Sequence, residues 1–215
     1  METEKLLILG LSEPTLTMIF DNLESCRLFP EISIVNNLSI NDLKPYTNPK
    51  FKIKILESLE NFSDEKVTFL GVNKPKSKFT VWQEFEKYAP NYINIINQAT
   101  SISSTVHLGV GVHINSLVSI AAFTRIGNWV SINRNASIGH HTEINDFVTI
   151  NPGANIAGFV KIGEKTLIGM GVNVIDGVSI GKNTIIGAGS LVTKDVPDGV
   201  IAYGNPCKII RENEA

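Results

Sequence analysis

The chain has 215 residues, 43% of them hydrophobic, with a formal net charge of −2 at pH 7 and a pI near 6.1. This length and hydrophobic content predict a globular protein with a substantial core, in one large domain or in a small domain joined to a medium one. The charge argues against a nucleic-acid or anionic-membrane partner, because either would favour a clustered excess of lysine and arginine.

The sequence also lacks the usual marks of export or membrane insertion. No stretch approaches the roughly 18 apolar residues of a membrane span, and the opening "METEKLLILG" has no apolar run of signal-sequence length. The two cysteines, Cys26 and Cys207, lie far apart and are expected to be reduced thiols without chemistry. We therefore expect a cytoplasmic protein.

Residues 1 to about 90 predict a small parallel α/β domain, because strand and helix patterns alternate there. "PTLTMIFDNLES" has helical periodicity with Pro14 near its first turn, and "KLLILG" is apolar enough for a buried strand. The expected elements are a strand over 5–10, a helix over 14–25, a strand over 31–37, a strand over 66–72 and a helix over 78–88.

A strict six-residue repeat occupies the rest of the chain. Every sixth residue from Ile96 to Val192 is aliphatic, and a small or β-branched residue follows each of them four positions later, from Thr100 to Val196. A period of six fits neither an amphipathic helix nor the alternation of a simple strand. The chain is therefore predicted to coil, each hexad forming one short flat side.

The repeat resembles that of the hexapeptide-repeat acyltransferases over residues 96 to 197, about half of the chain. The resemblance implies a left-handed parallel β-helix with three hexads in each triangular coil. It suggests three parts: a Rossmann-like α/β domain over 1–90 that resembles a sugar-nucleotide-binding domain, a β-helix over 91–199 and a C-terminal tail over 200–215.

With three hexads in each coil, residues 18 apart stack in columns along the axis. The aliphatic column is expected to face inward. Another column holds Asn135, Gly153, Gly171 and Gly189, which is what a ladder of left-handed turn residues looks like, because asparagine tolerates that conformation next best after glycine.

Two adjacent histidines, His140 and His141, interrupt this regular repeat in "IGHHTEI". They occupy the third and fourth places of a hexad, at a corner, so their side chains are expected to face outward. From the repeat alone, a solvent-exposed pair without a function and a catalytic pair are both open. The stacked columns predict open space on both sides of the first ring and an aromatic shelf around the second; they are Ala122, His140 and Gly158, and Phe123, His141 and Phe159.

Sialic acid O-acetyltransferases and the bacillosamine and perosamine N-acetyltransferases combine an α/β domain with this β-helix, and the chain resembles them. They carry a histidine followed by Asp or Glu in the matching hexad. The resemblance implies that His140 is the general base, since neutral imidazole accepts a proton near pH 7. His141 stands where the acidic residue is usual, so Glu143, Asp146 or a neighbouring subunit is expected to supply the charge.

The resemblance further implies acetyl-coenzyme A as acyl donor, bound in the groove between two β-helices of a homotrimer. Gly158 matches the position whose backbone N–H stabilises the oxyanion, although a plain turn glycine is the alternative. Thr149, Met170 and Ala188 match contacts to the acetyl and pantetheine arm. Lys208, in the closing "IAYGNPCKII", is either a phosphate contact or a solvated tail residue.

The same enzymes hold a nucleotide-linked sugar in the N-terminal domain, behind a glycine-rich turn. Here the turn is "LGLSEPTL": Gly10 and Ser12 remain, later glycines are absent, and Glu13 lies where a helix N-terminus would otherwise attract phosphate. The other candidate substrate contacts are Asn36, Asn37 and Asn73, each of which is equally explained by ordinary turn chemistry.

The sequence thus predicts an acetyl-coenzyme A-dependent N-acetyltransferase of polysaccharide biosynthesis, acting on a nucleotide-linked amino sugar by direct transfer. Sugar O-acetylation and a catalytically impaired scaffold are the alternatives. A zinc enzyme of the γ-carbonic anhydrase type needs three convergent histidines, and the wide-then-narrow spacing of that family is missing, so we expect no metal. An ice-binding solenoid would need flat ranks of threonine, whereas the outward positions here are mixed and charged.

Overall fold

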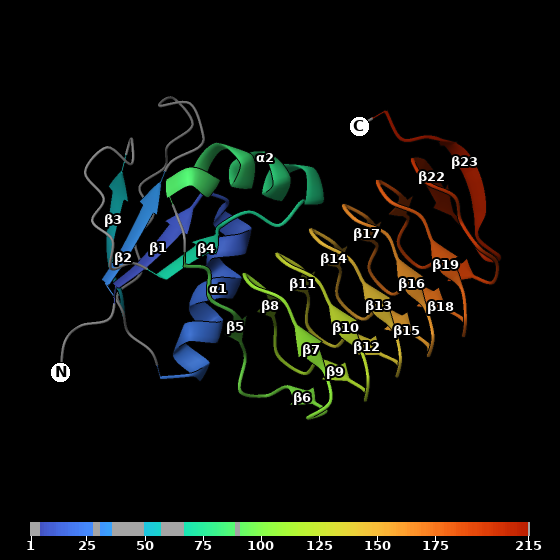
Figure 1. Cartoon of the computed structure of the whole chain (residues 1–215), viewed down its shortest axis with the longest axis horizontal. Coiled ribbons are helices and arrows are strands. Elements are labelled where there is room, and N and C mark those ends of the chain that lie inside the picture. Colours follow the sequence, from blue (N-terminus) through green and yellow to red (C-terminus); the bar gives the residue numbers. More distant parts are fainter. Residues whose placement is uncertain (1–4, 28–30, 36–49, 57–66, 89–90, 215) are drawn as a thin grey trace.

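The protein, seen in a computed structural model that describes residues 5–27, 31–35, 50–56, 67–88 and 91–214, consists of an α/β unit packed on one face of a parallel β-helix. Figure 1 shows the small sheet at one end of the molecule and the coils extending away from it. The predicted fold class is confirmed.

A parallel four-stranded sheet forms the α/β unit, in the order β3-β2-β1-β4. Three of its strands match the predicted ones, with the residues 36–37 of the predicted second strand lying outside the described residues. The strand β3 was not predicted, although the alternation of lysine and isoleucine in "KIKIL" is the pattern of a half-buried strand. The bounds are β1 Lys5–Leu9, β2 Glu31–Val35, β3 Lys52–Leu56 and β4 Val67–Leu70.

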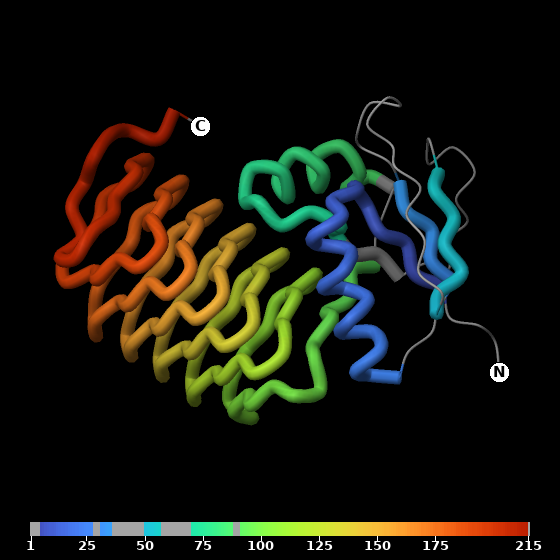
Figure 2. Tube along the Cα trace, turned by 180° about the vertical axis from the view of Figure 1, so that it is seen from behind, coloured from blue at the N-terminus to red at the C-terminus, as the bar shows by residue number. Residues whose placement is uncertain are grey.

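Two helices cover opposite faces of this sheet. α1 (Glu13–Ser25) has Pro14 in its first turn, as predicted, and packs on the face that carries Leu6 and Ile8. α2 (Pro75–Phe85) packs on the face of Leu7 and Leu9, and a 3₁₀ turn, η2 (Glu86–Tyr88), extends it. The second helix begins three residues before the predicted start at 78, because proline is well suited to a first helical position. Figure 2 shows α1 between the sheet and the first coils.

The β-helix has three flat faces, each built from parallel two-residue strands that repeat every third hexad, and one of them ends in longer strands. The six-stranded face contains β6 (Ser101–Ile102), β9 (Ser119–Ile120), β12 (Ser137–Ile138), β15 (Asn155–Ile156), β18 (Asn173–Val174) and β21 (Leu191–Val192). The five-stranded face contains β7 (His107–Leu108), β10 (Arg125–Ile126), β13 (Glu143–Ile144), β16 (Lys161–Ile162) and β19 (Ser179–Ile180).

The eight-stranded face carries the α/β unit at its first coils and ends in a hairpin. β22 continues the parallel face, and β23 pairs with it antiparallel, so the predicted tail is built into the sheet. The strands of this face are β5 (Ile95–Ile96), β8 (His113–Ile114), β11 (Ser131–Ile132), β14 (Thr149–Ile150), β17 (Leu167–Ile168), β20 (Ile185–Ile186), β22 (Val200–Tyr203) and β23 (Lys208–Glu212).

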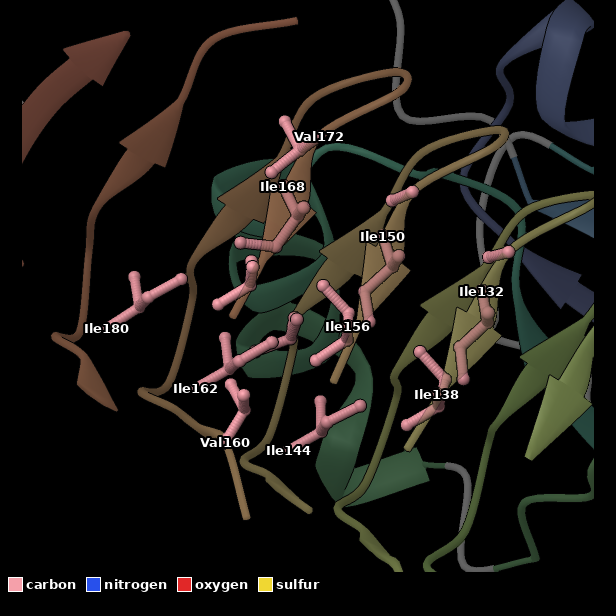
Figure 3. Packing of buried hydrophobic residues seen from close by; sticks show 14 of the residues in the cluster. Ile132, Ile138, Ile144, Ile150, Ile156, Val160, Ile162, Ile168, Val172 and Ile180 are labelled. Atoms are coloured by element: carbon pink, nitrogen blue, oxygen red, sulfur yellow. The ribbon is translucent and has the colours of Figure 1, made fainter. Parts of the chain in front are cut away.

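The aliphatic columns form the core of the coils, as predicted. Ile132, Ile150 and Ile168 are fully buried on the eight-stranded face, and Ile138 and Ile144 point inward from the other two. Figure 3 shows these side chains converging from all three faces. Each such buried side chain contributes about 1.5–3 kcal/mol relative to an exposed one.

From Gly111 to Gly189, every sixth residue lies at a corner and has left-handed backbone. The predicted ladder is confirmed: φ is +59° at Asn135, +69° at Gly153, +63° at Gly171 and +69° at Gly189. At the other corners bulky residues adopt this conformation, His141 among them with φ +56°. A non-glycine residue is strained there, and hydrogen bonds between coils hold it in place, such as His141 N–H to Ala122 C=O at 3.0 Å.

An aromatic cluster and a buried lysine join α2 to the coils. Trp82 packs against Trp129 and Phe147, whose rings are stacked with centroids 4.8 Å apart. Lys78 is 2% exposed, and its ammonium donates to the backbone carbonyls of Trp129 at 2.7 Å and Val148 at 2.9 Å. Burial lowers the pKa of Lys78 well below its ordinary value.

A buried polar network joins α1 to the same face. Asn22 Nδ2 lies 2.8 Å from His113 Nε2 and 3.2 Å from the carbonyl of Ile114, while Asn22 Oδ1 accepts from Asn97 Nδ2 at 2.8 Å. The amide nitrogen is thus the donor to His113, whose Nε2 must accept and stay unprotonated. Burial first, and the charge of Lys78 second, lower the pKa of His113 from 6.5 to about 3.

This network predicts acid sensitivity. Because the folded pKa of His113 lies below its ordinary value of 6.5, the unfolded chain takes up the proton first as the pH falls. The contribution of neutral His113 to the free energy of unfolding is complete above pH 6.5. It falls by on the order of 1 kcal/mol per pH unit as the pH decreases towards about 3.

Denaturant unfolding at pH 7.5, 6.0 and 5.0 checks this, with His113→Gln as the comparison because glutamine keeps an acceptor and does not titrate. The wild type should lose more stability than the variant over this range. Parallel losses in the two proteins would show that His113 does not carry the effect.

Candidate functional site

The two histidines lie at the corner between the six-stranded and five-stranded faces, in the turn from β12 to β13. Both side chains are exposed. The backbone around them is held from both sides, because His141 N–H donates to the coil before and His140 C=O accepts from Phe159 N–H at 2.9 Å. The repeat therefore presents the pair on a rigid corner rather than on a flexible loop.

The two imidazoles contact each other through their Nδ1 atoms, which lie 3.1 Å apart. The rings are nearly perpendicular, at 87°. One of the two nitrogens must carry the proton and the other must accept it. When His141 accepts, His140 is held in the tautomer whose Nε2 has a free lone pair, which is what a general base requires.

The aromatic shelf predicted around His141 is confirmed. Its ring is stacked on Phe159 at 4.8 Å and 16°, and it lies 4.9 Å from the ring of Phe123. Phe123 is 57% exposed and Phe159 51% exposed. This apolar column fixes His141 beside His140 and also leaves hydrophobic surface at the corner.

Gly158 lies directly beside the His140 ring in the next coil. A Cβ at Gly158 would stand 2.8 Å from His140 Cε1 and 3.0 Å from Nε2. The open space predicted on this side of the ring is thus taken up by the imidazole itself, so the site needs glycine for close approach. The Gly158 N–H donates no hydrogen bond to any of the described residues.

The carboxylates expected to accompany His140 lie elsewhere. Asp146 Oδ1 accepts the Asn128 N–H at 2.7 Å, at the corner between the five-stranded and eight-stranded faces. Glu143 lies on the flat five-stranded face, in register with Arg125 and Lys161. Neither forms a hydrogen bond with His140 in the described structure.

One carboxylate that the sequence analysis did not single out does reach this corner. Asp176 is in the column of His140 and Gly158, two coils after the histidine, and its Oδ1 would stand 2.9 Å from a Cβ at Gly158. The 18-residue spacing from His140 through Gly158 to Asp176 was visible in the sequence. Extending that column by one more coil would have found it.

The residues expected to contact the acyl donor do not lie beside His140 in the same chain. Met170, 59% exposed, and Ala188 stack at the corner between the eight-stranded and six-stranded faces. Lys208 begins the exposed strand β23. Thr149 is 1% exposed, and its hydroxyl donates to the backbone carbonyl of Asn73 at 2.5 Å.

The residues expected to contact a nucleotide lie partly together. Gly10 and Ser12 form the turn from β1 to α1, and Asn73 follows β4, the strand next to β1. These strands mark the point where the sheet order reverses, which is where parallel sheets bind ligands. Asn73 Oδ1 is buried without a hydrogen-bond partner in the described part of the chain. Asn36 and Asn37 lie outside the described residues.

The remaining histidines are apart from this corner: His107 is exposed on β7, and His113 is buried under α1. Among the described residues, no three His, Cys, Asp or Glu side chains gather in a way that would hold a metal ion. No described helix has the length and apolar character needed to cross a membrane.

Comparison with known proteins agrees with this architecture. Residues 159–194 match the sequence model described as bacterial transferase hexapeptide, six repeats. No curated protein matches the sequence significantly.

Solved structures match over almost the entire chain. A variant of perosamine N-acetyltransferase from Caulobacter crescentus, in complex with CoA and GDP-perosamine, is 24% identical with a TM-score of 0.83 and covers 99% of both chains. The acetyltransferase domain of PglB from Neisseria gonorrhoeae, in complex with acetyl coenzyme A, is 20% identical with a TM-score of 0.87, covering 97% of this chain and 100% of that one.

WeeI from Acinetobacter baumannii is 21% identical with a TM-score of 0.80, covering 96% of this chain and 100% of its own. These matches confirm the predicted left-handed β-helix behind an α/β unit. Together with the hexapeptide match, they also confirm the predicted resemblance to the hexapeptide-repeat acyltransferases.

The close approach at Gly158 predicts that Gly158→Ala moves the His140 ring. The added methyl would lie 2.8 Å from Cε1, so the ring must rotate away and lose its contact with His141. Histidine NMR spectra should show changed signals for His140 and His141, while those of the distant His107 and His113 stay in place. Unchanged signals for His140 would contradict the packing described here.

Proposed function

We propose that this hexapeptide-repeat acyltransferase transfers the acetyl group of acetyl-coenzyme A to the amine of a nucleotide-linked amino sugar, with His140 as general base. The observation that carries the proposal is the contact between the two Nδ1 atoms, 3.1 Å apart. With that contact in place, His140 Nε2 lies over Gly158, 3.0 Å from the position of a Cβ there.

The chemistry follows from this orientation. The sugar amine attacks the thioester carbonyl, and His140 Nε2 takes a proton from the nitrogen. The C–S bond then breaks, the new C–N bond remains, and the proton goes to the leaving thiolate of coenzyme A. His141 accepts a hydrogen bond from His140 Nδ1–H throughout, and it replaces the carboxylate that is usual in the resembling enzymes.

The backbone N–H of Gly158 is suited to stabilise the negative charge that develops on the thioester carbonyl oxygen. Its N–H has no acceptor among the described residues, and its Cα lies beside the base. A preorganised backbone donor at such a place is suited to an oxyanion. We assign this N–H to the thioester oxygen.

The acyl donor is proposed to lie between two copies of the chain. Met170 and Ala188 share a corner that is separated from His140 by the whole six-stranded face. A coenzyme arm that contacts both corners must therefore contact the Met170 corner of one subunit and the His140 corner of another. This supports the predicted homotrimer, because a site on an outer corner has one wall in a single chain.

The nucleotide is proposed to bind at the edge of the α/β sheet that carries Gly10, Ser12 and Asn73. The strand order reverses there, between β1 and β4. Glu13 is exposed in the first turn of α1 and disfavours a diphosphate at that helix end. We therefore place the diphosphate away from the α1 N-terminus.

Direct transfer is favoured over an acyl-enzyme. Cys207, the only cysteine in the β-helix part of the chain, packs against the core of the last coils, far along the axis from the histidines. Burial raises the pKa of its thiol, and a hydrogen bond with Ser190 offsets this in part. A raised pKa reduces the thiolate fraction that a nucleophile needs.

Replacement of the base should abolish most of the turnover. His140→Ala is expected to lower kcat for acetyl transfer by roughly 10²-fold or more, measured by thiol release from acetyl-coenzyme A with a panel of nucleotide-linked amino sugars. His107→Ala removes an exposed histidine from the neighbouring face and should leave the rate unchanged. Equal rates for His140→Ala and wild type would exclude His140 as the base.

The partner of the base can be tested by two replacements at position 141. His141→Phe keeps an aromatic ring in a column where Phe123 and Phe159 already adopt φ of +61° and +57°, but it removes the acceptor. It should lower kcat by roughly 10-fold, the size of a hydrogen bond to a charged group. His141→Asp restores a carboxylate and should retain at least the wild-type rate. Full activity of His141→Phe would show that the contact has no catalytic part.

A further inference from the structure

We infer that Asp176 recognises the acceptor amine, and so selects an amino sugar over a hydroxylated one. The inference rests on the proposed function and names the group that sets its substrate class. Its basis is that both side chains lie next to the Cβ position of Gly158. His140 belongs to the coil before Gly158, and Asp176 belongs to the coil after it.

The base and the carboxylate both border the position directly over the Gly158 Cα. The Cβ position of Gly158 is 3.0 Å from His140 Nε2 and 2.9 Å from Asp176 Oδ1. The two groups form no direct hydrogen bond or ion pair with each other. A nitrogen lying slightly further out from the backbone is therefore within reach of both.

Asp176 differs from the other aspartates of the coils. Asp146, Asp195 and Asp198 each accept a backbone N–H from the preceding coil, at 2.7 to 2.8 Å. Asp176 is exposed and, within the described structure, has no hydrogen bond or ion pair. The structural role that explains the other three aspartates does not explain this one.

The number of hydrogens on the acceptor decides the selectivity. An amine carries at least two N–H groups, so it donates one to His140 Nε2 and another to Asp176. A hydroxyl has a single O–H and leaves the carboxylate without a partner. A site built to bind a donor discriminates strongly against an analogue that lacks it.

The carboxylate also matches the charge that develops during attack. The nitrogen becomes positive as it bonds to the carbonyl carbon, and His140 becomes positive as it takes the proton. Asp176 borders the same position over Gly158 as His140 Nε2, whereas His141, as the acceptor of the His140 Nδ1–H, supplies no charge there. The negative charge of the Asp176 carboxylate stabilises the positive nitrogen and the positive imidazole by electrostatic attraction.

The test compares wild type with Asp176→Asn and Asp176→Glu on a matched pair of nucleotide-linked sugars, one with an amine and one with a hydroxyl at the same carbon. Asp176→Asn should reduce the preference in kcat/KM for the amine by about 10-fold or more, as for a lost charge-assisted hydrogen bond. The KM for acetyl-coenzyme A should not change, and Asp176→Glu should recover part of the preference.

Glu143→Gln is the control, since it removes an exposed carboxylate from β13, next to the histidine turn, and Glu143 is not among the atoms nearest to Gly158. It should leave the amine preference unchanged. An unchanged preference in Asp176→Asn would overturn the inference.

Calorimetric binding of the two sugars separates this inference from the proposed function. If wild type transfers acetyl to neither sugar, the proposed function fails, but Asp176 is still supported where wild type binds the amino sugar more tightly and Asp176→Asn does not. Equal affinity for the two sugars in wild type, or no binding of either, overturns the assignment of Asp176.

Discussion

Parallel stacking of coils with an 18-residue repeat is the constraint on which the structure depends. Backbone hydrogen bonds link each strand to the same strand of the next coil, and isoleucine and valine fill the interior without interruption. An insertion of one residue would turn every later side chain to the wrong side. The repeat is therefore exact from β5 to β21, and the spacing shortens beyond β21, where β22 pairs with β20. Any residue used for chemistry has to fit a position that points outward.

This constraint determines how a site can be built. His140, Gly158 and Asp176 come from three successive coils, and the stacking alone brings them together. Their backbones are fixed by bonds between coils, so the geometry needs no loop to close over it. The backbone of the turn is strained, because His141 has a left-handed conformation that glycine would adopt without strain. Its contacts with His140 and the flanking phenylalanines compensate for that strain.

The periodicity explains which features were predictable. The register, the buried columns and the stacking of Phe123 and Phe159 on His141 follow from counting residues. Side-chain rotamers do not follow from counting residues. The position of the His140 ring over Gly158 and the hydrogen bond between the two Nδ1 atoms were therefore not predictable from the sequence. The buried Lys78 was also unpredictable, because its partners are backbone carbonyls of another part of the chain, which have no signature in sequence.

The position of the α/β unit has a consequence for assembly. Its described residues cover the first coils of the eight-stranded face through Lys78, Asn22 and the aromatic cluster. The five-stranded face alternates Arg125, Glu143 and Lys161 and is suited to water. The six-stranded face carries small polar residues on its outside, in strands β9 to β18, and both proposed ligand corners border it. A neighbouring subunit approaching this face would bring its Met170 corner to the His140 corner of the first, so assembly and completion of the acyl-donor site would be one event.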